Sequence, residues 1–425
     1  MRMSADASTL ARELAASRER LQRITALLGD GQLLGPTLPI VNPPLWELGH
    51  LAWFQEFWCL RQRDDGSTRD SILRDADALY DSAKVAHSTR WSLPLPTIAD
   101  TRTYLADVLG LVRRRLETEP ENTRLLYFAD LAAFHEDMHA EAFHYTHQTL
   151  GYPDPLGSGD LADSPISEST EVELEGGNFL LGASQGTGFV FDNEKWAHEV
   201  RVEPFKIART AVSNAEYAAF VDAGGYSRRE FWSEAGWAWL AASGLKAPRY
   251  WQEAGDGWRA RSFDRMIPLP QSLPAMHVNW HEAEAYCRFA GRRLPTEAEW
   301  EFAASRGAGG GPKQRFPWGD TPPTPQHANL QGDAPASVEA HAAGDSTDGC
   351  RQLIGNVWEW TASPFGPYPG YVVDPYKEYS QPWFGNHMVL RGGSFATARR
   401  LVRTTWRNFY TPDRGDIFAG FRTCV

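Results

Sequence analysis

The first 150 residues of the chain show the apolar periodicity of an α-helix in four separate segments. In each segment, apolar residues recur every three or four positions, as in a helix with one buried face. The segments cover about residues 8–28, 43–57, 100–112 and 121–150. Proline suits the first turn of the second segment, and Asp100 or Thr101 can cap the third. Four such helices predict an antiparallel bundle, whose core is a usual place for metal ligands.

The pattern changes after residue 152. Residues 153–171 are rich in proline, glycine and serine, which predicts an interdomain linker. From residue 172 onward, glycine, proline and tryptophan are dense and long helical runs are few. The short elements predicted there are a hairpin of residues 172–174 and 178–182, strands at 200–202 and 205–208, and helices at 213–222 and 280–289. The chain is therefore expected to be an α+β protein with domains at 1–152 and 172–425.

Composition and charge narrow the functional class. The net charge is 42 − 54 = −12, which argues against a nucleic-acid or anionic-membrane partner. The four cysteines are scattered without a CxxC pair, so neither a disulfide framework nor a zinc–thiolate site is predicted. No apolar signal core or membrane-spanning run is found, and a cytoplasmic location is the expectation.

Two histidines on the fourth helix are the first candidate for chemistry. His135 and His139 are four residues apart, share one helix face, and lie on the apolar stripe. Glu141 points about 200° around the axis from His139, so it is not expected to ligate the same ion. His50 lies on the inward stripe of the second helix. The spacing leaves two interpretations open, a metal site and buried core histidines.

Seven short motifs in the second half resemble the formylglycine-generating-enzyme, or sulfatase-modifying, domain, which has a C-type-lectin-like fold. In chain order they are the segments at 214–217, 277–280, 293–301, 316–320, 355–360, 391–395 and 420–422. The formylglycine enzymes use a cysteine pair shortly after the Arg-Gly-Gly-Ser motif. Residues 396–402 contain no cysteine, which argues against that activity.

The N-terminal segment resembles a DinB-type bundle, through Gly-His-Leu-Ala-Trp-Phe around His50 and the spacing of His135, His139 and Glu141. The two domains together resemble the ergothioneine sulfoxide synthases. The resemblance implies Fe(II) bound by His50, His135 and His139, with Glu141 outside the ligand set. It also implies O₂ as co-substrate and formation of a bond between a chalcogen and C2 of the imidazole of hercynine.

Three positions depart from the glutamylcysteine-using branch of that family. Tyr410 stands where that branch has an Asp for the thiol substrate, and Met138 stands where it has a hercynine-contacting glutamine. Only Arg90, with His87 nearby, is found where that branch has two arginines. The loop at residues 85–91 is more similar to that of the selenoneine synthases, which implies a selenosugar as donor to hercynine.

The resemblance also implies roles for residues near the C-terminus. Asn408 and Phe409 match hercynine-binding positions, where an aromatic face suits a trimethylammonium group. Tyr379 and Tyr376 are the candidates for a catalytic, proton-donating tyrosine. Glu297 and Glu299 are expected to cap a helix, and Trp300, Trp318, Trp358 and Trp360 to pack in the core.

Three other functions stay open at this point. The chain could be an ergothioneine-type synthase that uses a cysteine-derived thiol. It could also be a zinc-dependent thiol S-transferase that needs no O₂. The third is a non-catalytic, lectin-like binding protein in which the bundle is only a scaffold.

Overall fold

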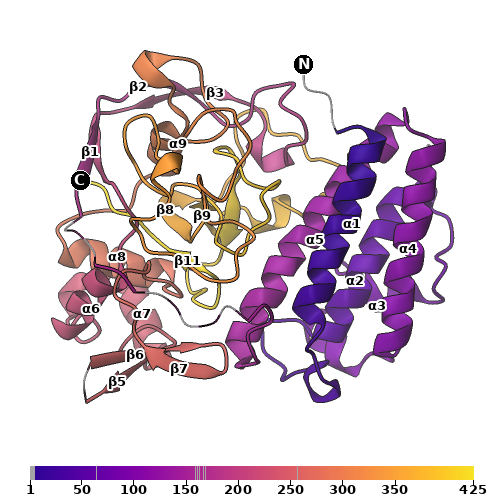
Figure 1. The fold of residues 1–425 in the computed structure, drawn as a ribbon, viewed down its shortest axis with the longest axis horizontal. Coiled ribbons are helices and arrows are strands. Elements are labelled where there is room, and N and C mark those ends of the chain that lie inside the picture. Colours follow the sequence, from indigo (N-terminus) through magenta and orange to yellow (C-terminus); the bar gives the residue numbers. More distant parts are fainter. Residues whose placement is uncertain are drawn as a thin grey trace. The chain divides into compact units, whose positions relative to one another are not determined.

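The structure is a computed structural model that describes residues 5–425, apart from positions 64, 158, 160, 162, 166, 168 and 256. The chain divides into two compact units. Unit 1 comprises Met1–Leu156 with Gly186–Phe189, and unit 2 comprises Gly157–Gln185 with Val190–Val425. Unit 1 is helical and unit 2 mixes short helices and strands, which confirms the predicted α+β class (Figure 1). Five positions of the predicted linker (158, 160, 162, 166 and 168) lie outside the described residues.

Four long helices form unit 1 where the sequence predicts them. They are α1 (Ala7–Thr25), α2 (Pro44–Glu56), α4 (Ile98–Thr118) and α5 (Thr123–Leu150), and they run side by side in Figure 1. A short helix, α3 (Ala76–Tyr80), precedes the loop that carries Arg90. The prediction that Asp100 or Thr101 caps α4 is wrong. Thr97 caps it, because its side chain accepts the N–H of Asp100 at 3.2 Å.

Arg18 of α1 connects three helices inside unit 1. Its Nε lies 2.6 Å from Oε1 of Glu136 on α5, and a second guanidinium nitrogen donates to Oε1 of Gln55 on α2 at 3.0 Å. Both side chains of the ion pair are almost completely buried. Because an uncompensated charge in this position would be costly, the cluster specifies how α1, α2 and α5 pack, one residue from His135.

The first four strands of unit 2 form one long, interrupted ribbon instead of the predicted hairpin. They are β1 (Glu171–Leu174), β2 (Gly177–Leu181), β3 (His198–Val202) and β4 (Phe205–Ala208). β2 pairs with β3 and β1 pairs with β4, so β1 and β2 are consecutive parts of the same arm. The interruption lies opposite Pro204, which has no N–H to donate to a ladder. The strand segments were predicted correctly, but the predicted pairing of β1 with β2 is wrong.

The other elements of unit 2 surround a small central sheet with the order β10-β9-β8-β11. Its strands are β8 (Trp358–Pro364), β9 (Met388–Arg391), β10 (Asn408–Tyr410) and β11 (Ala419–Gly420). A separate sheet comprises β5 (Trp251–Ala254), β6 (Gly257–Ser262) and β7 (Arg265–Pro268). The helices are α6 (Asn214–Asp222), α7 (Glu234–Ser243), α8 (Trp280–Phe289) and α9 (Glu297–Ser305). The predictions of α6 and α8 are confirmed.

Three of the four tryptophans expected in the core are there. Trp300, Trp358 and Trp360 are buried, whereas Trp318 is half-buried and stacks between Phe316 and His327. The prediction is therefore wrong for Trp318.

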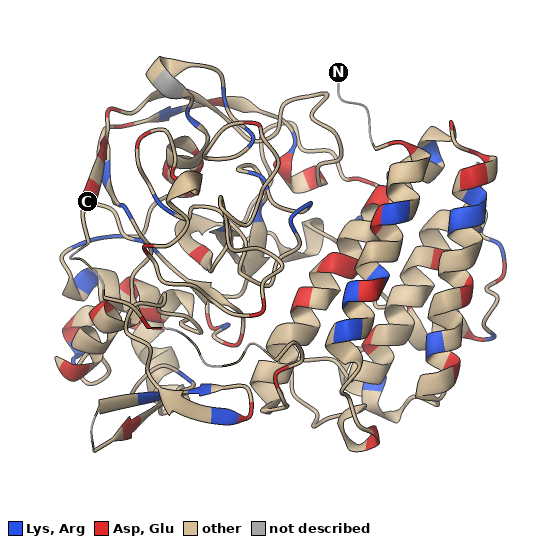
Figure 2. Ribbon diagram, in the orientation of Figure 1, with Lys and Arg blue, Asp and Glu red and all other residues tan. Residues whose placement is uncertain are grey.

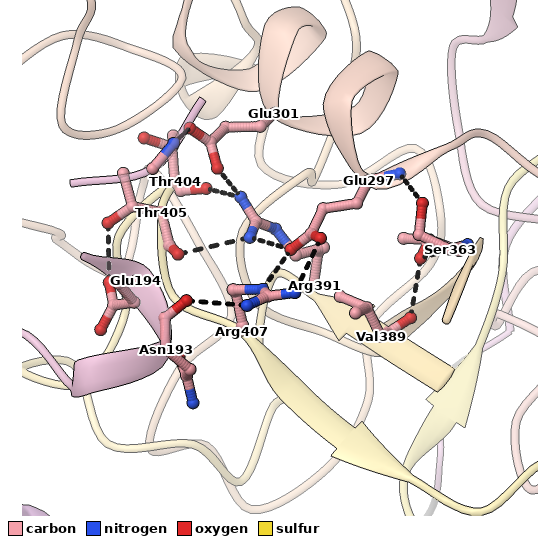
Figure 3. A network of polar contacts seen from close by, with 12 residues as sticks. Asn193, Glu194, Glu297, Glu301, Ser363, Val389, Arg391, Thr404, Thr405 and Arg407 are labelled. Carbon is pink, nitrogen blue, oxygen red and sulfur yellow. Dashed lines mark hydrogen bonds and ion pairs between the residues drawn. The ribbon is translucent and has the colours of Figure 1, made fainter. Parts of the chain in front are cut away.

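A buried network of charges holds the irregular part of unit 2 together (Figure 3). Arg391 of β9 forms ion pairs with Glu297 and Glu301 of α9, and Arg407 pairs with Glu297 at 2.6 Å. Glu299 completes a capping box with Thr296 as predicted. Glu297 does not cap the helix, because its carboxylate is occupied by the two arginines.

Acidic and basic residues are interspersed along the helices of unit 1 (Figure 2). Among the described residues, no helix combines the length and the hydropathy that crossing a membrane requires.

Candidate metal centre

Three histidines of unit 1 converge on one point. His50 comes from α2, and His135 and His139 come from successive turns of α5. One ring nitrogen from each lies within 4.8 Å of the other two, and within the described part of the chain this is the group of His, Cys, Asp and Glu side chains suited to hold an ion. Because metal–imidazole bonds are about 2.1 Å long, the three nitrogens fit a single ion with small side-chain movements.

Short helix α3 holds the His50 ring. The last carbonyls of a helix lack partners within it, and here two of them accept hydrogen bonds from α2. Tyr80 O lies 2.9 Å from His50 Nδ1, and Leu79 O accepts from Trp46 Nε1 at 2.7 Å. The Trp46 and His50 rings stack with centroids 5.0 Å apart. Since a carbonyl can only accept, the proton of His50 is on Nδ1 and Nε2 is left to bind a metal.

The other two rings are held in different ways. His139 Nδ1 lies 2.6 Å from Oε1 of Glu47, a buried carboxylate of α2. The His135 ring stacks on Phe54, with centroids 3.6 Å apart and planes 7° from parallel. Sequence reasoning missed Glu47. The available signal was its position one turn before His50, because residues three apart share a helix face.

Burial keeps the two interior rings neutral. It lowers the pKa of His50 to about 3, with the neighbouring His139 as a smaller cause. Burial also holds the pKa of His135 well below its usual value, again with His139 as the next cause. Neutral imidazole is the form that binds metals, so no proton has to leave these rings near neutral pH.

The remaining acidic and imidazole groups of α5 are outside the three-histidine group. Glu141 is buried and does not belong to it, in agreement with its direction on the helix. His144 and His147 are both buried and also lie outside the group.

Arg90 is part of the packing around this centre. Its guanidinium lies 3.8 Å from the Trp46 ring centroid and donates to Asn42 Oδ1 at 2.6 Å. His87 Nε2 lies 2.8 Å from Val41 O, so this ring is bound to the backbone. Met138 is half-buried next to His139 on α5.

Tyr379 and Phe409 lie together in unit 2. Tyr379 stacks on Phe191 with centroids 4.2 Å apart, and the edge-on contact with Phe409 has centroids 5.7 Å apart. Burial raises the pKa of Tyr379 well above its usual value, so the phenol keeps its proton at neutral pH. The Tyr376 ring is 6.1 Å from that of Tyr379.

The loop that carries these tyrosines is anchored by Asp192. Its carboxylate accepts from the hydroxyl of Tyr371 at 2.7 Å and from Ser380 Oγ at 2.5 Å. Lys195 adds an ion pair to Asp374 at 2.6 Å. Ser380, the residue after Tyr379, is therefore held in place by its hydrogen bond to Asp192.

Strand β10 separates two of the predicted substrate residues from the third. Successive side chains of a strand point to opposite faces, so Asn408 and Tyr410 share one face and Phe409 occupies the other. Phe409 stacks on Phe365 with centroids 4.0 Å apart. The Tyr410 ring lies 4.9 Å from the guanidinium carbon of Arg414.

Gly49 offers a direct test of how His50 is positioned. A Cβ atom at Gly49 would lie 2.2 Å from Cζ of Tyr80, whose carbonyl holds His50. We expect Gly49→Ala to lower the free energy of unfolding by about 1–3 kcal/mol, the usual cost of overpacking, and to weaken metal binding. Chemical denaturation and metal titration measure the two effects.

Gly110 of α4 is the matched control. A Cβ there would meet only the end of Arg114, at 3.7 Å, so Gly110→Ala should leave metal binding unchanged and not destabilise the helix. Equal behaviour of the two variants would contradict the role of the Tyr80 contact.

Comparisons with known proteins match both parts of the chain. Residues 13–143 match the DinB superfamily, and residues 158–425 match the family described as sulfatase-modifying factor enzyme 1-like domain. The chain is 40% identical to the hercynine oxygenase of Mycolicibacterium smegmatis, over 97% of this chain and 98% of that protein. It is 39% identical to that of Mycobacterium tuberculosis, over 97% of each chain. The formylglycine-generating enzyme of Streptomyces coelicolor is 36% identical over 64% of this chain and 94% of its own length.

Proposed function

The chain belongs to the hercynine oxygenase family, in which a DinB-superfamily domain precedes a sulfatase-modifying-factor-like domain, and on that premise we propose a specific reaction. The protein is a non-heme Fe(II) oxygenase that joins selenium, or sulfur, to C2 of the imidazole of hercynine. The preferred donor is a selenosugar. The coupling removes one hydrogen from C2 and one from the chalcogen. O₂ takes up these two protons and two electrons to give H₂O₂, or gives water when its other oxygen atom is kept on the chalcogen as an oxide.

The three-histidine group is the observation that carries this proposal. Two helices bring His50, His135 and His139 together with a nitrogen of each within 4.8 Å, and burial keeps His50 and His135 neutral. These three neutral imidazoles would hold Fe(II) without cancelling its charge, and the ion would supply binding positions for the substrate imidazole, the chalcogen donor and O₂.

Residues of unit 2 are proposed to handle the organic substrates. Asn408 and Phe409 contact hercynine, where the ring of Phe409 suits the trimethylammonium group. Tyr379 is favoured over Tyr376 as the proton donor, because it packs against Phe409 and its neighbour Ser380 is anchored by Asp192. A phenol kept protonated by burial can give its proton to a strongly basic oxygen.

The donor preference rests on the residues that differ from the glutamylcysteine-using branch. Tyr410 offers a hydroxyl in place of a carboxylate, and Met138 offers no hydrogen-bond donor. The guanidinium of Arg90 already donates to Asn42 and to the Val85 carbonyl, which leaves fewer N–H groups to bind a carboxylate of a glutamylcysteine donor. A hydroxylated, weakly charged sugar fits this set better than a dipeptide thiol.

A competition assay tests the proposed reaction. Fe(II)-loaded protein, hercynine and O₂ are incubated with a selenosugar, glutamylcysteine and cysteine together, and the products are identified by mass spectrometry. We expect the selenium product to dominate. Faster consumption of glutamylcysteine or cysteine would refute the donor assignment and favour the alternative in which a cysteine-derived thiol is the donor.

Two controls in the same assay address the other candidate functions. Turnover without O₂, or with zinc in place of iron, would favour a zinc-dependent thiol S-transferase. Absence of any product, with hercynine binding unaffected by His50→Ala, would favour a binding protein.

A further inference from the structure

Glu47 is a buried carboxylate for which neither the motifs nor the proposed reaction provides a role. Its side chain is 3% exposed, and burying a carboxylate is costly unless both oxygens find partners. Oε1 accepts from His139 Nδ1 at 2.6 Å, and Oε2 accepts from Asn42 Nδ2 at 3.3 Å. One partner is thus a candidate metal ligand.

The contact with Oε1 determines the tautomer of His139. A carboxylate accepts, so the proton of the imidazole is on Nδ1 and the lone pair of Nε2 is free to bind an ion. The negative charge beside Nδ1 also makes the ring a stronger electron donor. His50 has a neutral carbonyl at the equivalent place, so the two ligands differ in what supports them.

Asn42 connects Glu47 to Arg90. Its amide can satisfy both neighbours in one orientation, with Nδ2 toward the carboxylate and Oδ1 toward the guanidinium, 2.6 Å away. Arg90 also lies over the Trp46 ring, which stacks on His50. Arg90 therefore reaches His139 through Asn42 and Glu47, and reaches His50 through Trp46.

We propose that Glu47 is a positioning residue of the metal centre, which holds His139 as an Nε2 ligand and increases its donor strength, and that Asn42 and Arg90 hold Glu47 in place. This inference rests on the proposed metal-binding function. It assigns Arg90 to the support of the ligands and links the loop that carries Arg90 to the electronic environment of the ion.

The test uses Co(II) as a spectroscopic probe in the metal-free, full-length protein. Glu47→Gln keeps the shape and can still accept from Nδ1, but removes the charge. We expect it to bind Co(II) about 10–100-fold more weakly, the usual effect of losing such a partner, and to change the ligand-field absorption bands. Glu47→Ala should have a larger effect, and Asn42→Ala a smaller one because the bond to His139 remains.

Glu56 is the matched control, because it is another buried carboxylate of α2. It accepts from the hydroxyls of Tyr104 at 2.5 Å and Ser71 at 2.6 Å and is not part of the histidine group. Glu56→Gln should keep the Co(II) affinity and spectrum of the parent protein. Equal losses in Glu47→Gln and Glu56→Gln would show a general effect on folding and overturn the positioning role.

Two further outcomes separate this inference from the proposed function. Unchanged Co(II) affinity and spectrum in Glu47→Gln, with binding that depends on His50, would overturn the role of Glu47 alone. The metal centre and the inference would be overturned together if the parent protein bound no Co(II), or if His50→Ala bound Co(II) as tightly as the parent does.

Discussion

Replacing His135 by alanine is expected to abolish oxygen-dependent turnover and to weaken metal binding by more than about 100-fold, beyond the range for partners outside the ligand set. The ring centroid of His135 lies 5.1 Å from that of His50 and 4.5 Å from that of His139. The alanine variant keeps only two of the three imidazoles, and it also loses the stacking of the His135 ring on Phe54. Equilibrium dialysis with Fe(II) or Co(II), followed by metal analysis, measures the affinity.

His144→Ala is the control for this experiment. His144 is also fully buried on α5 but lies outside the three-histidine group. We expect the control to lose stability in thermal denaturation and to keep metal binding at one ion per chain. The interpretation of His135 as a ligand would be wrong if His135→Ala retained the metal as well as His144→Ala does.

The helical half of the protein could be predicted almost completely from local patterns. Four segments with the period of a helix became four helices, because an amphipathic stripe in a bundle is specified by residues close in sequence. The cap of α4 was misplaced by three or four residues, since several polar residues there could accept an N–H of the first turn. Ends are the least specified part of a helix.

Unit 2 could be predicted only in pieces. The strand segments have the right composition, but the pairing of β1 with β4 depends on contacts between residues about 35 positions apart. The hairpin prediction failed because two runs separated by glycines resemble a turn even when they continue in one arm. The fold of unit 2 could be predicted from the resemblance of its motifs to a known family, and not from hydrophobic periodicity.

The candidate metal centre could also be predicted only in part from the sequence. The helical spacing placed His135 and His139 on one face, and the inward stripe of α2 contained His50. Glu47, Tyr80 and Phe54, which hold the three rings, were not predicted. Each of them acts across helices, and Tyr80 acts through a backbone carbonyl that leaves no sign in the sequence.

Replacing Arg391 by alanine is expected to lower the free energy of unfolding of unit 2 by about 3–5 kcal/mol, because it leaves buried carboxylates without their partner. The Arg391 side chain is completely buried, and it contacts Glu297 at 2.9 Å, Glu301, and the carbonyls of Thr404 and Thr405 (Figure 3). Denaturant unfolding measures the change. An exposed pair provides the control: Arg201 and Glu203 are 68% and 71% exposed, and Arg201→Ala should have little effect.

A double-mutant cycle on Arg391 and Glu301 then distinguishes a coupled pair from two independent losses. Each single variant leaves a buried charge uncompensated, whereas Arg391→Ala with Glu301→Ala removes both charges. The double variant is therefore expected to lose less stability than the two single variants added together. Additive losses would contradict a direct interaction in the folded protein. In Glu301→Ala, the cation of Lys313 is near solvent and Arg391 keeps its ion pair with Glu297. We therefore expect the Arg391 variant to lose more stability than the Glu301 variant.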